Sequence, residues 1–302
     1  MNVFGRLNNI TKQGEKYDWF YSNEKPKQDS PDYYLSFYNM YNLLQINDAI
    51  IFGVFDEAVE RNQMTTEELL NMANPDNYAV ELINYFPILG VRPPENIIEM
   101  CNEDRGIDTS FAYELQKNHV DPFKWFRNTN EFVQLYAIFE QAIKEFLELD
   151  HINEKDVIEK LIERLSADTL TDNFLRILHF KTFGIIETDT EMKAVWNFYT
   201  KVRHCISHSG GRITKKVIDS FNEIKSKYKD TIQLIENRDW LRQFFLLSES
   251  DDYTLFKCNY SIGDMLYLDQ KSLNFFRMFC VFIIETLNKL HSFSTSGHTD
   301  QK

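Results

Sequence analysis

Glycine and proline are scarce in this 302-residue chain, which contains 10 Gly and 7 Pro. These two residues supply most of the tight turns that barrels and sandwiches need between their strands. Apolar residues make up 43% of the chain, enough for a sizeable buried core. The sequence therefore predicts an all-α protein, a bundle of long helices with few turns.

Apolar residues at helical spacing indicate where the helices lie. We predict helices at 33–62, 122–149, 153–166, 170–185, 188–209, 214–229, 230–247 and 270–292. Asp121-Pro122 is a typical helix start, and Gly210-Gly211 is a typical helix end. Residues 253–268 are rich in β-branched and aromatic residues around a glycine, so a small β-hairpin is expected there.

Four phenylalanines on the last predicted helix follow helical spacing and leave two alternatives open. They either pack against the helix of residues 188–209 or form a seam between two copies of the chain. These residues are Phe275, Phe276, Phe279 and Phe282.

The chain divides into two predicted regions, separated where prolines and glycines cluster between residues 87 and 110. We place an N-terminal helical region at 1–120, a helical domain at 121–295 and a disordered tail at 296–302. The N-terminus has no apolar core long enough for a signal peptide, and no apolar run approaches the ~20 residues that span a bilayer. The four cysteines form no CxxC pair, so a cytoplasmic protein with no membrane association is expected.

Charge is distributed unevenly along the chain. The net charge is −13, which argues against a general nucleic-acid binder. Residues 201–302, however, carry 15 Lys and Arg against 12 Asp and Glu. The local field matters more than the total charge when one phosphate has to be bound, so a phosphate site in residues 201–302 is compatible with the acidic total.

Residues 201–211 read KVRHCISHSGG and contain the three candidate site residues, Arg203, His204 and His208. On a helix, His204 and His208 lie together because they are four residues apart. Arg203 and His208 are about 140° apart, but arginine is long and His208 is at the helix end, so both can flank one groove. The core-facing stripe of the same helix would be Val195, Tyr199, Val202 and Ile206.

These residue types suit phosphoryl chemistry. Imidazole titrates near neutral pH and can move a proton, while guanidinium stays charged and binds phosphate oxygens. In RNA, a base can activate the 2′-hydroxyl while arginine stabilises the charge that builds on phosphorus. That route needs no metal, and the chain has no phosphate-binding loop or dinucleotide motif, so no cofactor is expected.

The stretch WNFYTKVRHCISHSGG, residues 196–211, resembles the motif helix of the HEPN superfamily, in which an arginine, a polar residue, three further residues and a histidine follow one another. The predicted helices across 122–295 are similar in order to those of HEPN domains, whereas residues 1–120 match no family. The superfamily has a subset with a modified tyrosine two residues after the histidine. Gly210 occupies that position here, which disfavours this subset.

The resemblance implies a metal-independent endoribonuclease that acts as a homodimer, with two R-x4-H motifs facing each other in one site. It implies that Arg203 binds and polarises phosphate, that His208 is the acid and base, and that His204 supports both. The products would be a cyclic phosphate and a 5′-hydroxyl. HEPN domains of this type occur in prokaryotic toxin, abortive-infection and antiviral defence systems, so an antitoxin or another defence protein is an expected partner besides RNA.

Other interpretations stay open. Arg203 and His208 also suit a surface ion pair or a helix cap, because the helix dipole favours cations at a C-terminus. His204 and His208 form an H-x3-H zinc half-site, although no third or fourth ligand lies nearby in the sequence. The whole chain can also be a non-catalytic HEPN-like scaffold that holds a nucleotide or a protein, or a helical antitoxin or adaptor whose acidic N-terminal half contacts a basic partner.

Overall fold

The computed structural model describes residues 30–45, 122–182, 184–238 and 259–296. The chain divides into two compact units, residues 1–18 with 45–122 and residues 19–44 with 123–302, and the described residues belong almost entirely to the second. Of the described residues, 78% are helical and none forms a strand or sheet, which confirms the all-α prediction. No helix among them is both long and apolar enough to cross a membrane.

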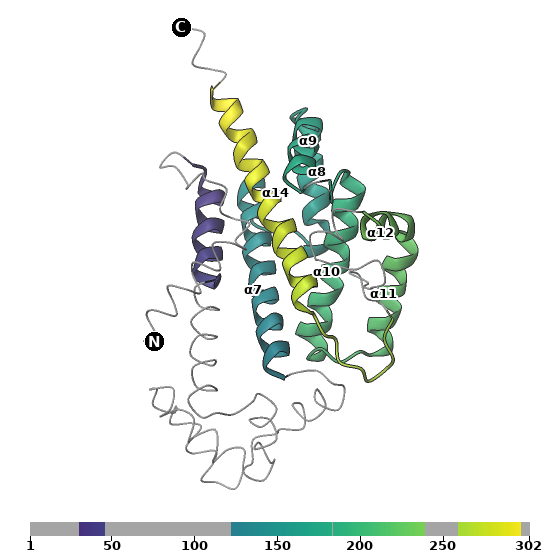
Figure 1. Ribbon diagram of the computed structural model, residues 1–302. Helices are drawn as coiled ribbons and strands as arrows, with labels where there is room; N and C mark the ends of the chain where they lie inside the picture. The colour runs from purple at the N-terminus through teal and green to yellow at the C-terminus, as the bar shows by residue number, and fades with distance from the viewer. Residues whose placement is uncertain (1–29, 46–121, 183, 239–258, 297–302) are drawn as a thin grey trace, which may run out of the picture. The chain divides into compact units, whose positions relative to one another are not determined.

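Most of the predicted helices are confirmed (Figure 1). Residues 32–45 form the start of the helix predicted from residue 33, and its remainder, 46–62, lies outside the described residues. The helix predicted over 230–247 ends early, since Asn237 caps it, and residues 239–247 are not described. In chain order the structure has α7 (Pro122–Leu147), the short 3-10 helix η1 (Glu154–Asp156), α8 (Val157–Ala167), α9 (Thr171–Lys181), α10 (Asp189–Ser209), α11 (Lys215–Lys227), α12 (Lys229–Glu236) and α14 (Gln270–Ser296).

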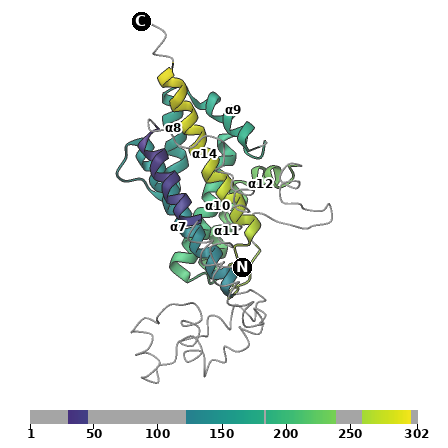
Figure 2. The same ribbon diagram turned by 60° about the vertical axis from the view of Figure 1, so that its left-hand side comes forward.

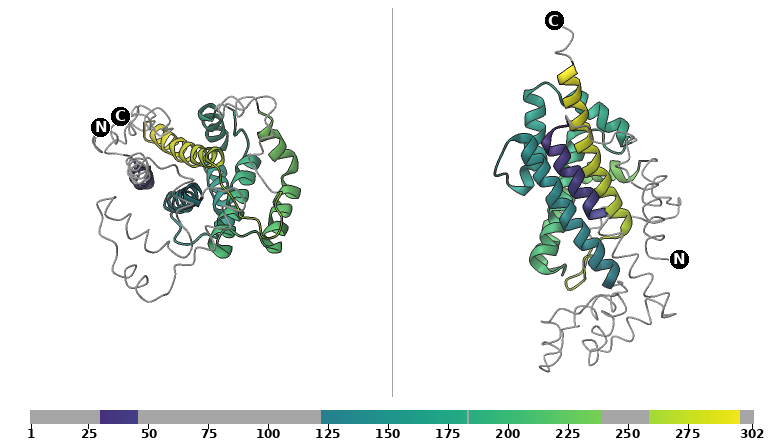
Figure 3. Two further views of the ribbon diagram at one scale, coloured as in Figure 1. Left: turned by 60° about the horizontal axis from the view of Figure 1, so that its bottom comes forward. Right: turned by 90° about the vertical axis from the view of Figure 1, so that its left-hand side faces the viewer.

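Helix α10 occupies the centre of the bundle, where it contacts η1, α8, α11 and α12. The helix of residues 32–45, drawn in purple, lies alongside α7 and α14 (Figures 2 and 3). Its Tyr33 meets Phe146 of α7 edge to face, with ring centroids 5.3 Å apart. This helix therefore belongs to the same unit as α7, although the sequence analysis assigned residues 1–120 to a separate region.

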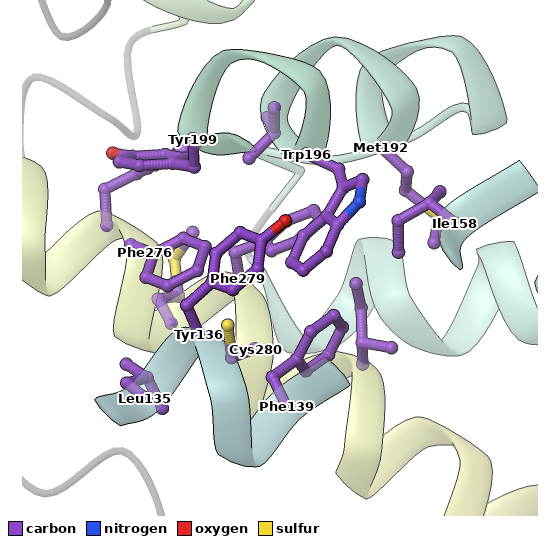
Figure 4. Packing of buried hydrophobic residues seen from close by; sticks show 14 of the residues in the cluster. Leu135, Tyr136, Phe139, Ile158, Met192, Trp196, Tyr199, Phe276, Phe279 and Cys280 are labelled. Carbon is purple, nitrogen blue, oxygen red and sulfur yellow. The ribbon is translucent and has the colours of Figure 1, made fainter. Parts of the chain in front are cut away.

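Aromatic rings from α7, α10 and α14 converge in the core (Figure 4). The ring of Tyr136 in α7 stacks on that of Trp196 in α10, with centroids 4.4 Å apart. The ring centroids of Tyr199 in α10 and Phe276 in α14 are 4.5 Å apart. All four phenylalanines predicted to lie on one side of the last helix are buried within the chain. Phe275 and Phe276 contact Tyr199 of α10, whereas Phe279 contacts Phe139 of α7 and Phe282 lies beside Lys181 of α9, so all four belong to the core of a single chain.

Residues 253–258 of the hairpin expected over 253–268 lie outside the described residues, and its described part forms no strand. Residues 259–268 contain a turn and one isolated antiparallel bridge, from Met265 to Arg212. The amide of Ile213 donates to Asp264 O at 2.8 Å, and the amide of Leu266 donates to Gly211 O, also at 2.8 Å. The described part of the segment thus pairs with the loop after α10, and this pairing holds the end of α10 in place.

Candidate functional site

Both ends of α10 are set by local sequence. At the N-terminus, Thr188 and Glu191 form a capping box: the Glu191 amide donates to the Thr188 hydroxyl at 3.2 Å, and the Thr188 amide donates to the Glu191 carboxylate at 3.1 Å. At the C-terminus, Gly210 has φ +58° in the left-handed region and ends the helix. The predicted glycine cap is confirmed.

The second glycine of the pair is required by packing. Gly211 has φ +81°, and a Cβ atom built on it would lie 2.8 Å from Cζ2 of Trp125. Trp125, near the start of α7, is buried and donates its indole N–H to Leu266 O at 2.7 Å. The glycine thus lets α7, α10 and the segment before α14 meet closely at the end of the motif helix.

The predicted core stripe of α10 is confirmed. Val195, Tyr199 and Val202 are buried, and Ile206 is half-buried against the core. The three candidate site residues occupy more exposed positions: the side chains of Arg203 and His204 are 26% and 44% exposed, and His208 is exposed. They are therefore accessible to a ligand without any rearrangement of the core.

A glutamate that the sequence analysis did not select joins two of the candidates. Nη1 of Arg203 donates to Oε1 of Glu154, and Nε2 of His204 lies 3.0 Å from Oε2 of the same carboxylate. Glu154 is the first residue of η1. In sequence it is 49 residues from Arg203, and nothing in its spacing distinguishes it from Asp156 or Glu159 nearby. Only the tertiary fold identifies it.

Two further contacts hold this cluster. The indole N–H of Trp196 donates to the backbone oxygen of Glu154 at 2.7 Å, so η1 is tied to the helix that carries Arg203. The guanidinium carbon of Arg203 lies 5.2 Å from the ring centroid of Tyr136, a cation–π contact. The Tyr136 hydroxyl lies 2.9 Å from that of Thr200, whose own hydroxyl donates to Trp196 O. Since the Thr200 proton is used in that way, Tyr136 is the donor between the two.

The surroundings determine the protonation of these groups. Burial raises the pKa of Glu154, but hydrogen bonds and positive charge from His204 and Arg203 outweigh burial and lower it overall. Glu154 is therefore a carboxylate at neutral pH. Burial raises the pKa of Tyr136 far above neutrality, with a smaller contribution from nearby carboxylates, so this phenol stays protonated.

His208 stands apart from the cluster. Its ring lies edge-on to that of His204, with centroids 5.7 Å apart, which confirms that the two histidines share one side of the helix. In the described part of the chain, His208 makes no hydrogen bond or ion pair and touches Arg203 only indirectly, through His204. Its imidazole is therefore accessible to a ligand.

The zinc alternative gains no third ligand from the fold. Across the described ranges, no three His, Cys, Asp or Glu side chains group in a way that could hold a metal ion. Glu154 contacts His204, but Glu154, His204 and His208 do not form a group of three that could bind one metal ion.

Cys205 lies between the candidate residues in sequence but not in space. It is buried, and its Sγ lies 3.6 Å from the backbone oxygen of Arg212, to which it donates. Burial raises the pKa of this thiol to about 12. Cys205 is therefore part of the packing under the helix end and not of the candidate site.

No family model matches the chain, and no curated protein or solved structure matches it either. The resemblance of residues 196–211 to HEPN domains thus stays a prediction from sequence. The candidate site itself contains one guanidinium on an aromatic ring, one carboxylate and two imidazoles at a helix end.

Proposed function

We propose that the protein is a metal-independent endoribonuclease of the HEPN type, acting as a cytoplasmic homodimer in a toxin or antiviral defence system. One observation carries the proposal: the exposed His208 imidazole lies next to the ring of His204, which shares the Glu154 carboxylate with the Arg203 guanidinium. A proton-transfer group and a permanent cation at one helix end are the two parts that RNA cleavage without metal requires.

The reaction would proceed by attack of the ribose 2′-hydroxyl on the adjacent phosphorus. His208 takes the hydroxyl proton as the new O–P bond forms, and the bond from phosphorus to the 5′-oxygen breaks. A protonated imidazole gives its proton to that departing oxygen, which leaves a 5′-hydroxyl and a 2′,3′-cyclic phosphate. Arg203 would stabilise the extra negative charge on phosphorus in the transition state.

A homodimer is part of the proposal because the reaction needs a base and an acid at once. Within the motif, His208 is the imidazole that makes no hydrogen bond or ion pair among the described residues, whereas His204 contacts Glu154. Two copies related by a twofold axis would bring two such imidazoles and two guanidinium groups to one phosphodiester. Confining RNA to that cleft is also compatible with a net charge of −13.

The test is cleavage of total RNA by the purified protein in the presence of EDTA. His208→Ala should lower the rate by about 100-fold or more, and Arg203→Ala by a similar factor. The matched control is His179→Ala, which removes an exposed histidine from α9, away from the motif. Equal rates for wild type and His208→Ala would refute the proposed role, and cleavage that EDTA abolishes would point to a metal instead.

A second candidate function is a non-catalytic scaffold that holds a nucleotide or a protein partner. The ion pair between Arg203 and Glu154 favours it, because the only cation of the cluster already has a carboxylate partner. This candidate predicts that a purified, dimeric protein binds its ligand through Arg203 but cuts no RNA.

A further inference from the structure

The Arg203 guanidinium has one acceptor and room for another. Among the described residues its only hydrogen bond goes from Nη1 to Glu154, while Tyr136 covers one face of the group. A guanidinium has five N–H donors in a planar fork, so several of its donors point elsewhere. Carboxylate and phosphate oxygens both bind this fork in the same way. Glu154 thus holds a position that an oxygen of a phosphodiester would also take.

Glu154 can leave that position without a change of fold. Its backbone oxygen is fixed by the Trp196 indole, but its side chain is 29% exposed and belongs to a three-residue helix with no buried residue. Rotation about side-chain bonds would carry the carboxylate into solvent while η1 stays in place. Arg203 would stay supported by the ring of Tyr136.

The charges favour exchange over simple addition. Arg203 and the ionised Glu154 together carry no net charge, so the pair attracts an anion weakly. With the carboxylate rotated away, the cation is uncompensated and a phosphodiester monoanion replaces the lost partner. With the carboxylate still in place, the same anion would be repelled by it at close range.

We infer that Glu154 is an internal competitor for the phosphate position at Arg203, and that a phosphodiester binds by displacing its carboxylate. The residue would then determine how tightly the protein holds RNA. This inference rests on the proposed function, because it takes the anion at Arg203 to be the phosphodiester of the substrate.

The test measures binding of a fluorescently labelled 2′-deoxy oligonucleotide, which carries phosphodiesters but lacks the hydroxyl needed for cleavage. Fluorescence anisotropy at low salt gives Kd for wild type, Glu154→Gln and Glu154→Ala. Both substitutions should tighten binding about fivefold, as expected for removal of one exposed ionic competitor. Because the Trp196 bond goes to the backbone of Glu154, the fold should be retained, which thermal unfolding by circular dichroism checks.

Two controls make the result specific. Glu159→Gln removes the same charge from an exposed position five residues further on and should change Kd by less than about twofold. In an Arg203→Ala background, Glu154→Gln should give no gain. Unchanged or weaker binding by both Glu154 variants would overturn the inference, and so would an equal gain for Glu159→Gln.

The failures of the two proposals are distinguishable. If wild type cuts no RNA but Glu154→Gln still binds more tightly through Arg203, the internal competitor is supported and the nuclease is not. If wild type cuts RNA in EDTA and the Glu154 variants bind no more tightly, the nuclease is supported and the internal competitor is overturned.

Discussion

Helix α10 has an arginine–glutamate pair near each end, and the two pairs differ in how the arginine is used. At the N-terminal end, Arg238 pairs with Glu191, and the two side chains are 13% and 2% exposed. Arg238 also donates to the backbone oxygens of Gly184 and Ile185, at 2.7 and 2.6 Å, and lies 3.2 Å from Glu187. Nearly all its donor capacity joins the segment after α12 to the start of α10.

At the C-terminal end, Arg203 makes one hydrogen bond, to Glu154, and both side chains are more than a quarter exposed. Two ion pairs of the same residue types thus differ in their physical roles at the two ends of one helix. The buried arginine with many acceptors joins two parts of the fold, whereas the partly exposed arginine has one acceptor among the described residues and further N–H donors that are not used there. The number of acceptors and the degree of burial, not the presence of the pair, separate the two.

Replacing each arginine by alanine should give the largest difference in stability between the two ion pairs. Arg238→Ala leaves the Glu191 carboxylate buried without its cation, so we expect the free energy of unfolding to fall by about 3 kcal/mol or more. Arg203→Ala leaves a carboxylate that reaches solvent, and the expected loss is below about 1 kcal/mol. Urea unfolding measures both. Equal losses would mean that the two ends of α10 do not differ as described.

The C-terminal end of α10 can also be destabilised by substituting its two glycines. Gly211→Ala should cost about 3 kcal/mol, since the new methyl meets Trp125 at 2.8 Å in addition to the strain of a positive φ. Gly210→Ala is the matched control, because it carries the same kind of strain with no atom within 4 Å, and should cost about 1 kcal/mol. Comparable losses in urea unfolding would show that Trp125 yields to the methyl group.

A substitution of Tyr136 can show whether its ring or its hydroxyl group positions Arg203. Tyr136→Phe removes the hydroxyl bonded to Thr200 but keeps the ring beside the guanidinium, and Thr200 still donates to Trp196 O. The expected cost is about 1 kcal/mol in urea unfolding. If the ring is the support, RNA cleavage should stay within about twofold of wild type. A loss of cleavage as large as that of Arg203→Ala would instead assign the role to the hydroxyl.

The smallest expected effect is the pH dependence of the Glu154 pair. Its pKa is lower in the folded protein than in the unfolded chain, so its stabilising contribution is complete above the ordinary glutamate pKa of about 4.3 and is lost as the pH falls through the folded value. The stability difference between wild type and Glu154→Gln, below about 1 kcal/mol at pH 7, should therefore shrink on acidification. Thermal unfolding from pH 7 to pH 3 measures it, and a difference that grows would contradict the assigned pKa direction.

The helices were predictable because they depend on local chemistry. Pro122 begins α7, Gly210 ends α10, and the apolar spacing between them gives the buried faces. The proximity of His204 to His208 was predictable for the same reason, since residues four apart on a helix are neighbours. These features need only the sequence within a turn or two of each residue.

Long-range pairing was not predictable. Glu154 was missed because its role depends on how η1 packs against α10, and no local pattern marks one glutamate among several. The pairing of residues 263–266 with the loop after α10 was missed for the same reason: Met265 and Leu266 are buried apolar residues, which a strand would also contain, and their partner lies about 50 residues earlier. In both cases the decisive neighbour is far away in sequence.

The buried thiol of Cys205 can be used to detect fraying of the C-terminal end of α10. Burial raises the pKa of this thiol to about 12, so very little of it is the reactive thiolate at pH 7, and the sulfur is covered as well. Alkylating reagents should reach it only when the last turn of α10 opens. The rate at which this one peptide gains a label, followed by mass spectrometry, would then give the opening frequency of the helix end that carries His208, and whether RNA or a second copy of the chain slows it.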